Sequence, residues 1–226
     1  MSKTANNAQG SLTVLHHLSD DLLMSYAAGT LSEGWSLGVA THLSFCPTCR
    51  GRLSEYEMLG GYFLECEEVS RVGSEGWAEI KKLIDLDDEP AKTMVSQRSD
   101  PLLPQPLLAY VNAAGGLRWR SLGSGASQMK LPTSDKSTNV RLLRIPAGKP
   151  VPEHGHRGRE LTLVLSGSFG DSVSVFTRGD VELADDELTH QPIATADSDC
   201  ICLAVTEAPL RFTSRVLRFL QPLLGI

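Results

Sequence analysis

Residues 148–167 read GKPVPEHGHRGRELTLVLSG, and this stretch decides the fold of the larger part of the chain. His154 and His156 are two residues apart, and Glu160 begins an alternating apolar run. On a strand, residues two apart point to the same face, so the two imidazoles are expected side by side. Glu160 at the start of the next strand can meet them across the hairpin. The spacing therefore predicts a cluster of ligands on one face of a β-sheet.

Short alternating runs surround this stretch from Leu107 onward. They are broken by Gly, Pro and Asp, and they cover residues 117–122, 140–145, 161–165, 172–176 and 200–205. Several short strands at regular spacing are typical of an all-β sandwich or barrel, and a domain of this size favours a jelly roll.

A further histidine completes the set of ligands in this region. Gly179-Asp180 leads through residues 181–189 to His190, on a later strand. Three imidazoles and one carboxylate in a barrel mouth suit a first-row divalent metal. We predict a metal site, with zinc the expected ion, made by His154, His156, Glu160 and His190. Cys200 and Cys202 also face one way, and we interpret them as small buried apolar residues of the core.

The first ninety residues carry helix signals instead. Ser19 precedes two acidic residues and an apolar face that ends at Gly29, a second helix is expected from Ser32 to about Phe45, and a third follows Pro47. The third helix is expected to turn Leu53, Tyr56, Gly60 and Phe63 inward. A fourth, after Ser74, carries an apolar stripe. Its members are Trp77, Ile80, Leu83 and Ile84.

The chemistry of the helical part lies in His42-Leu43-Ser44-Phe45-Cys46-Pro47-Thr48-Cys49. His42 and Cys46 fall on one face of a helix end, and Cys49 falls in the first turn of the next helix, where the helix dipole favours a thiolate. One more ligand would close a tetrahedral zinc site, and either His16 or His17 can supply it. A redox dithiol, or two merely buried cysteines, are the alternatives.

Charge separates the two parts of the 226-residue chain. Residues 1–90 contain 14 acidic residues against 6 Lys and Arg, whereas residues 91–226 contain 13 against 15. A net charge of -6 for the chain argues against direct binding to nucleic acid. No long apolar run or signal-like N-terminus predicts a membrane segment, and five cysteines do not form a disulfide framework, so a cytoplasmic protein is expected.

These patterns predict an α+β multidomain protein. Its helical zinc-binding domain covers residues 1–90, a Pro-rich linker covers 91–106, and a β-barrel covers 107–226. The helix with the Trp77 stripe either packs on the first three helices or lies in a groove of a partner, since amphipathicity alone does not separate these roles.

The barrel motif resembles the two cupin motifs. Gly148, His154, His156, Glu160 and Gly167 match the first motif throughout. Gly179 and His190 match the second, whereas Asp185 and Glu187 replace its usual Pro and Gly, and Ala194 its frequent Asn.

Together with His16-His17-Leu18-Ser19-Asp20, residues 26–32 and residues 40–49, the whole chain from about His16 resembles the ChrR-type zinc anti-sigma factors. The resemblance selects His17, with His42, Cys46 and Cys49, as the zinc ligands. It implies a helical anti-sigma domain joined to a cupin-like sensory domain.

The resemblance also implies a function. Such a protein holds an extracytoplasmic-function sigma factor inactive in a 1:1 complex and releases it under stress such as singlet oxygen or other oxidants. The acidic half is a plausible cover for the basic DNA-binding surfaces of a sigma factor. The alternative is a metal-dependent cupin oxygenase or hydrolase with a zinc-bearing helical oligomerisation module. The barrel offers no histidine beyond the three ligands for proton transfer, so we expect a regulator and no enzymatic activity.

Overall fold

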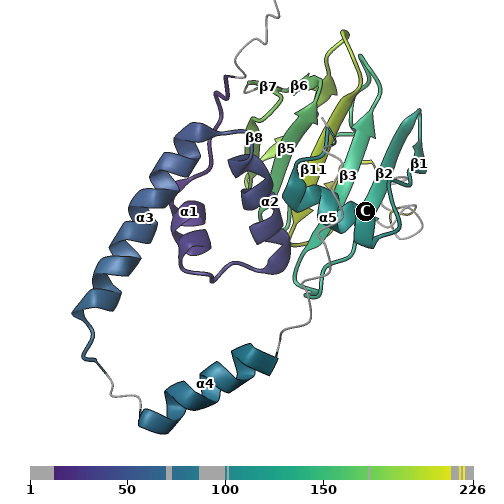
Figure 1. The fold of residues 1–226 in the computed structure, drawn as a ribbon. Helices are drawn as coiled ribbons and strands as arrows, with labels where there is room; N and C mark the ends of the chain where they lie inside the picture. The colour runs from purple at the N-terminus through teal and green to yellow at the C-terminus, as the bar shows by residue number, and fades with distance from the viewer. Residues whose placement is uncertain are drawn as a thin grey trace, which may run out of the picture.

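A computed structural model of the chain describes residues 13–69, 73–86, 100, 102–172, 174–214, 219 and 221. Helices occupy the N-terminal part and strands the C-terminal part, as Figure 1 shows. This confirms the predicted fold class. The helices are α1 (Asp20–Ala27), α2 (Glu33–Leu43), α3 (Pro47–Cys66), α4 (Ser74–Leu86) and α5 (Gln105–Ala113).

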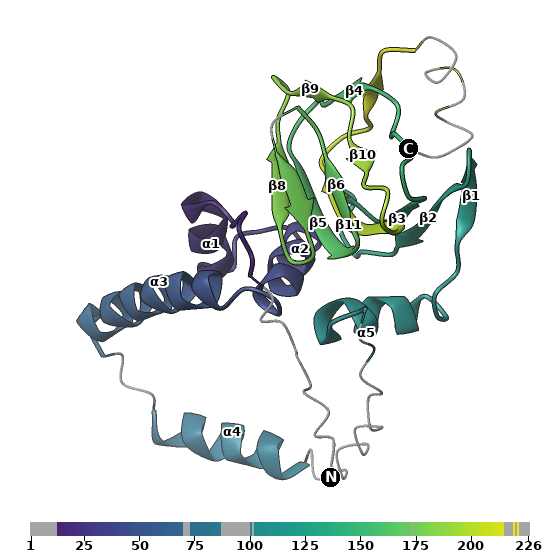
Figure 2. The same cartoon turned by 90° about the horizontal axis from the view of Figure 1, so that it is seen from above.

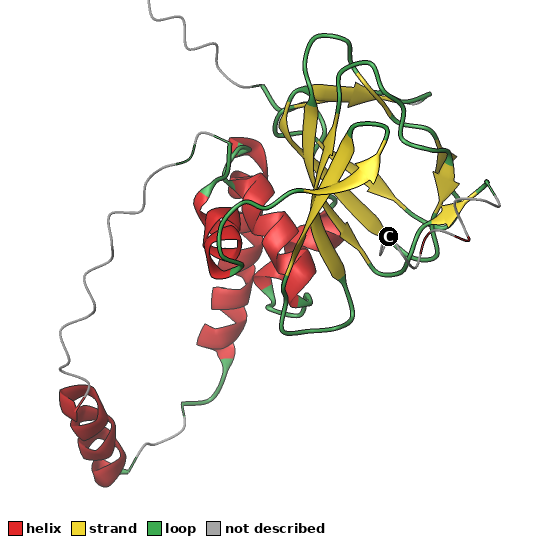
Figure 3. Ribbon diagram, turned by 90° about the vertical axis from the view of Figure 1, so that its right-hand side faces the viewer, coloured by secondary structure: helices red, strands yellow, loops and turns green. Residues whose placement is uncertain are grey.

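The strands build one large and two small antiparallel sheets. They are β1 (Arg120–Gly123), β2 (Ala126–Leu131), β3 (Asn139–Ile145), β4 (His154–Gly155), β5 (Glu160–Ser166), β6 (Ser168–Gly170), β7 (Val175–Thr177), β8 (Val181–Ala184), β9 (Thr189–His190), β10 (Ile193–Ala194), β11 (Cys200–Thr206) and β12 (Arg211–Phe212). The six-stranded sheet has the order β1-β2-β3-β11-β5-β8, and the small sheets have the orders β10-β6-β7 and β12-β4-β9. The small sheets face the large one and close a barrel-like body (Figure 3).

Helix α2 joins the two parts of the molecule. Most of its residues are buried, because it lies between α1 and α3 on one side and the large sheet on the other (Figure 2). A methyl group at Gly34 would come 2.2 Å from Oγ1 of Thr138, and one at Gly38 would come 3.2 Å from Val205. One continuous hydrophobic core therefore runs from Leu23 in α1 through α2 into the sheet. Among the described residues, the helical part shares this core and has no separate one.

The second half of α3 differs from the sequence prediction. Leu53 is buried and Tyr56 half-buried, but Phe63 is 60% exposed instead of pointing inward. The other large apolar side chains of this half are also exposed. They are Met58, Leu59, Tyr62 and Leu64. Only the first turns of α3 pack against α1, and the remainder projects from the body, as Figures 1 and 2 show.

Helix α4 lies apart from the other helices and from the barrel (Figure 1). The residues of its apolar stripe are largely exposed to solvent: Trp77 is 65% exposed, Ile80 47%, Leu83 63% and Ile84 62%. The structure therefore does not bury this stripe against the first three helices, which was one of the two predicted roles.

Helix α5 was not predicted from the sequence, which placed a linker up to residue 106 and strands from residue 107. Pro106 falls in the first turn of α5, where the lack of an N–H costs nothing. Leu107 and Val111 are buried, and the hydroxyl of Tyr110 donates to Oε1 of Glu33 at 2.7 Å, which fixes α5 beside α2. Most of the predicted linker lies outside the described residues. In the described part of the chain, no helix is long and apolar enough to span a membrane.

Candidate metal centres

The structure brings His17, His42, Cys46 and Cys49 together in one cluster, called here the helical site. Their ligand atoms all lie within 4.8 Å of one another. Nδ1 of His17 is 3.2 Å from Sγ of Cys46 and 3.7 Å from Sγ of Cys49. His17 precedes α1, His42 ends α2, and the two cysteines open α3, so three segments converge on one point.

The turn between α2 and α3 sets the position of both thiols. Cys46 is the N-cap of α3, and its Sγ accepts the backbone N–H of Cys49 at 3.3 Å. Pro47 follows at the first helical position, as expected. Burial raises the pKa of the Cys49 thiol to about 11, although we predicted that the helix dipole would favour a thiolate. A metal must therefore displace a proton from Cys49 when it binds.

The orientation of His42 fits a metal ligand. Its Nδ1–H donates to the carbonyl of Gly179 at 3.0 Å, a bond that leaves Nε2 as the lone-pair nitrogen. That Nε2 is buried and has no hydrogen-bond partner among the described residues. Burial lowers the pKa of His42 to about 4, so the imidazole is neutral at pH 7, the form that binds metal. The donor set fits zinc.

The neighbouring His16 has a different role. Its Nε2 lies 2.8 Å from Oγ of Ser174, and its ring packs on Phe176 at 4.4 Å between centroids. The backbone N–H groups of Leu15 and His16 both donate to Oδ1 of Asp180. His16 therefore ties the segment before α1 to the barrel and leaves His17 free to face the thiols.

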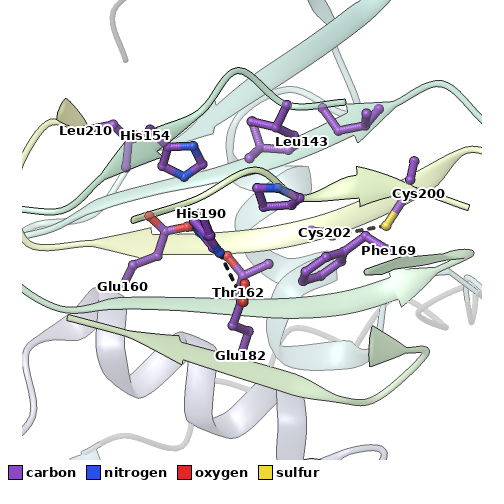
Figure 4. Close-up of a pocket in the computed structure, with 14 residues that line it drawn as sticks. Leu143, His154, Glu160, Thr162, Phe169, Glu182, His190, Cys200, Cys202 and Leu210 are labelled. Carbon is purple, nitrogen blue, oxygen red and sulfur yellow. Dashed lines mark hydrogen bonds and ion pairs between the residues drawn. The ribbon is translucent and has the colours of Figure 1, made fainter. Parts of the chain in front are cut away.

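The second cluster, called here the barrel site, contains His154, His156 and His190, whose ligand atoms also lie within 4.8 Å of one another. His154 and His190 are directly opposed in the β4–β9 pair (Figure 4). The Nε2 atoms of His156 and His190 are 3.4 Å apart, so two lone-pair nitrogens point at the same space. All three imidazoles are buried. Three convergent imidazoles fit a first-row divalent metal.

Glu160 lies beside these imidazoles, but its carboxylate is not part of the cluster that His154, His156 and His190 form. Its Oε2 lies 3.3 Å from Nδ1 of His156, and its Oε1 accepts the hydroxyl of Thr162 at 2.8 Å. Burial raises the pKa of Glu160, but the contacts with His156 and His154 outweigh it and lower the pKa. In this arrangement Glu160 orients His156, and its predicted role as a fourth ligand requires it to turn away from that ring.

Two carboxylates that the sequence analysis missed hold His190. Nδ1 of His190 lies 3.2 Å from Oδ2 of Asp171 and 3.3 Å from Oε1 of Glu182. Burial lowers the pKa of His190, but Glu182 and Asp171 outweigh this and raise it. Burial raises the pKa of Glu182. The signal for Glu182 was its alternation with Val181 on a strand beside β5, which places it on the interior face.

Cys200 and Cys202 are buried, as expected, and their sulfur atoms are 3.4 Å apart (Figure 4). They belong to a small apolar cluster inside the barrel with Val164, Phe169 and Phe176. Cys66 is exposed at the end of α3. None of these three thiols belongs to either metal cluster in the described part of the chain.

Comparison with known proteins identifies the family. The chain is 47% identical over 216 residues, which is 95% of its length, to the complete anti-sigma-E factor ChrR of Cereibacter sphaeroides. This chain belongs to the ChrR family of anti-sigma factors. The ChrR cupin-like domain matches residues 109–209.

A solved structure agrees with this family assignment. The crystal structure of Rhodobacter sphaeroides SigE in complex with the anti-sigma ChrR is similar to this chain, with a TM-score of 0.74 and 46% sequence identity, and covers 86% of this chain and 99% of its own chain. The resemblance inferred from the two metal motifs is therefore confirmed.

Proposed function

We propose that this anti-sigma factor binds an extracytoplasmic-function sigma factor in the cytoplasm, in a 1:1 complex, and holds it inactive. The observation that carries the proposal is the similarity over nearly the whole chain to a family member solved with a sigma factor. Both relatives are named as anti-sigma factors, which favours a regulator over the alternative of a cupin oxygenase or hydrolase.

The exposed apolar surface of α3 and α4 supports a docking role. We define the α3–α4 surface as the exposed apolar side chains of these two helices. They are Met58, Leu59, Tyr62, Phe63 and Leu64 of α3 and Trp77, Ile80, Leu83 and Ile84 of α4. Exposed apolar surface on this scale marks an interaction site, because water penalises it in a free monomer. Its aromatic members, Tyr62, Phe63 and Trp77, are of the kind that often dominates binding energy.

The helical site has a supporting role in this proposal. Zinc on His17, His42, Cys46 and Cys49 would fix the start of α3 relative to α1 and α2, and so would set the direction in which the rest of α3 projects. Residues 1–90 carry the excess of acidic charge, which complements a basic sigma factor.

The barrel site, with zinc as the proposed ion, is the sensory or structural centre. We propose that a stress signal such as singlet oxygen or another oxidant acts on the cupin-like domain and leads to release of the sigma factor. The metal would be held by the three imidazoles of His154, His156 and His190, with Glu160 beside them.

The test is binding of the full-length chain to purified sigma factors encoded in the same genome, by size-exclusion chromatography and calorimetry. Trp77→Ala with Leu83→Ala should weaken the complex by at least about tenfold, because each removes a large apolar contact. Glu79→Ala with Lys82→Ala, on the opposite side of α4, is the matched control and should change affinity little. If no such sigma factor binds the wild-type chain, the proposed function is wrong.

A second arm concerns zinc. Cys49→Ser should lower the metal content of the chain and weaken sigma binding in parallel. If the variant lacks that metal and still binds with unchanged affinity, zinc has no part in the inhibition.

A further inference from the structure

A cavity of about 470 Å³ lies inside the barrel, on the side away from the helices. Its wall is mostly apolar and includes Leu143, Ile145, Val151 and Phe212. It reaches Glu160, and it shares Leu143, Ile145 and Leu210 with the pocket that His154 and His190 line (Figure 4). Its volume is in the range of small-molecule binding sites, roughly 300–1,000 Å³. The barrel therefore has room for a ligand beside its metal centre.

One charged side chain in this cavity lacks an adequate partner. Arg141 lines the cavity and is only 6% exposed. Its Nη1 reaches Oε1 of Gln128 at 3.5 Å, the outer limit of a hydrogen bond, and its Nε has no partner among the described residues. Within the described ranges no carboxylate forms an ion pair with it. Glu160 acts on it only as a charge at a distance.

A guanidinium in this position requires an anion. Arginine stays charged inside a protein, and an uncompensated buried charge is strongly unfavourable. Its planar fork of N–H donors matches a carboxylate with two parallel hydrogen bonds. Burial lowers the pKa of Arg141, a sign that its surroundings as they stand disfavour the charge.

A second cation, Lys130, lies beside Arg141 but is exposed and does not line the cavity. Lys130 is directly opposite Arg141 in the β2–β3 pair, so both side chains leave the same face of the sheet. Burial and the nearby charges of Arg141 and Arg120 lower the pKa of Lys130. The cavity thus combines one cationic end with an apolar wall.

We propose that this cavity binds a small amphipathic carboxylic acid, with the carboxylate on Arg141 and the apolar body against Leu143, Ile145 and Phe212. The proposal does not depend on the sigma factor, because the ligand is bound by the barrel alone.

The probe is decanoate, titrated into the metal-loaded full-length chain by calorimetry, with decanol as the uncharged analogue. Wild-type protein should bind decanoate at least about tenfold more tightly than decanol, because of the charge-assisted bidentate pair. Arg141→Met, which keeps an unbranched apolar side chain, should abolish this preference and leave decanol binding unchanged. Arg141→Lys, which keeps the charge without the fork, should recover only part of it.

Arg144→Met is the matched control, because Arg144 is on the same strand but exposed and paired with Asp199 at 2.7 Å. Unchanged metal content and circular dichroism show that each variant is folded. The proposal is overturned if wild-type protein does not bind decanoate, if decanol binds equally well, or if Arg141→Met keeps the preference for decanoate.

Discussion

Asp180 is the residue through which the barrel holds the helical site, and its replacement by Asn gives the sharpest test of the structure. Its carboxylate is completely buried. Oδ1 accepts the backbone N–H groups of Leu15 at 2.6 Å and His16 at 2.9 Å, and Oδ2 accepts the N–H and the hydroxyl of Thr177, both at 2.8 Å. The adjacent Gly179 carbonyl accepts Nδ1–H of His42. One turn therefore positions both His16 and His42.

The expected cost of Asp180→Asn follows from these four hydrogen bonds. An asparagine amide has one oxygen, so its NH₂ group would face either the two N–H donors of Leu15 and His16 or the N–H and hydroxyl of Thr177. The hydroxyl can turn to accept from the NH₂ group, but the backbone N–H cannot. Each bond to a charged group is worth about 1.5–3 kcal/mol. Loss of at least one such bond predicts that the free energy of unfolding falls by about 1.5–3 kcal/mol.

The pH dependence gives an independent check. Burial raises the pKa of Asp180, but the hydrogen bonds from His16, Thr177 and Leu15 outweigh burial and lower the pKa below its usual value. A carboxylate with a lowered pKa stabilises the fold above its unfolded pKa of about 3.9, and loses that contribution as the pH falls through the folded value. The difference between wild type and Asp180→Asn should therefore be largest at neutral pH and shrink below about pH 4.

The assay is urea unfolding of the full-length chain, followed by tryptophan fluorescence, together with chelator-induced zinc release. Asp180→Asn should also weaken zinc at the helical site by about tenfold or more, because the carbonyl that orients His42 moves. Asp185→Asn is the matched control, since Asp185 is exposed and follows the same strand β8. A loss of stability below about 1 kcal/mol, or an unchanged zinc release rate, would refute the role of this turn.

Two further perturbations test the packing and the barrel site. Gly34→Ala should destabilise the chain by about 1–3 kcal/mol in urea unfolding, because its methyl group would collide with Thr138. Gly60→Ala, which has open space around it, should stabilise α3 by up to about 1 kcal/mol. Equal effects of the two substitutions would contradict the contact between α2 and the sheet. His190→Ala should remove one metal per chain by elemental analysis and leave the metal of the helical site bound. Loss of both metals, or of neither, would contradict two separate centres.

Local spacing predicted part of each cluster, because metal ligands must be close in space and several are close in sequence, whereas His17 was chosen over His16 only from the family resemblance. The closeness of His42 to Cys46, and of His154 to His156, follows from the helix and strand periods, although α2 ends at Leu43 and β4 ends at Gly155. Asp171 could not be found in this way, because it lies in the loop before β7. Alternation with Val181 places Glu182 on one face of its strand, but it does not show that β8 pairs with β5. Such contacts are set by tertiary structure.

The shared core was missed for a related reason. Helical spacing alone does not show that Gly34 and Gly38 leave a face of α2 smooth enough to lie directly on the sheet. A helix that is apolar on all sides is buried on all sides. The sequence around Phe63 does not show that its side chain points outward. Apolar residues that pack in a core and apolar residues that bind another protein have the same helical spacing.

The close contact between the two parts changes how a signal would travel between the two metal centres. A route along residues 91–106 is not required. His190 touches Glu182 on β8 at 3.3 Å, and β8 begins directly after the turn whose Gly179 carbonyl holds His42 at 3.0 Å. That turn is fixed to β5, because the N–H of Gly179 donates to the carbonyl of Val164 and the N–H of Val164 donates to that of Asp180. A short, hydrogen-bonded strand thus joins a residue that contacts the barrel site to His42 of the helical site. Because coupling between two binding sites is reciprocal, a change of metal at His190 that weakens zinc at His42 requires that loss of zinc at His42 weakens the barrel metal by the same factor.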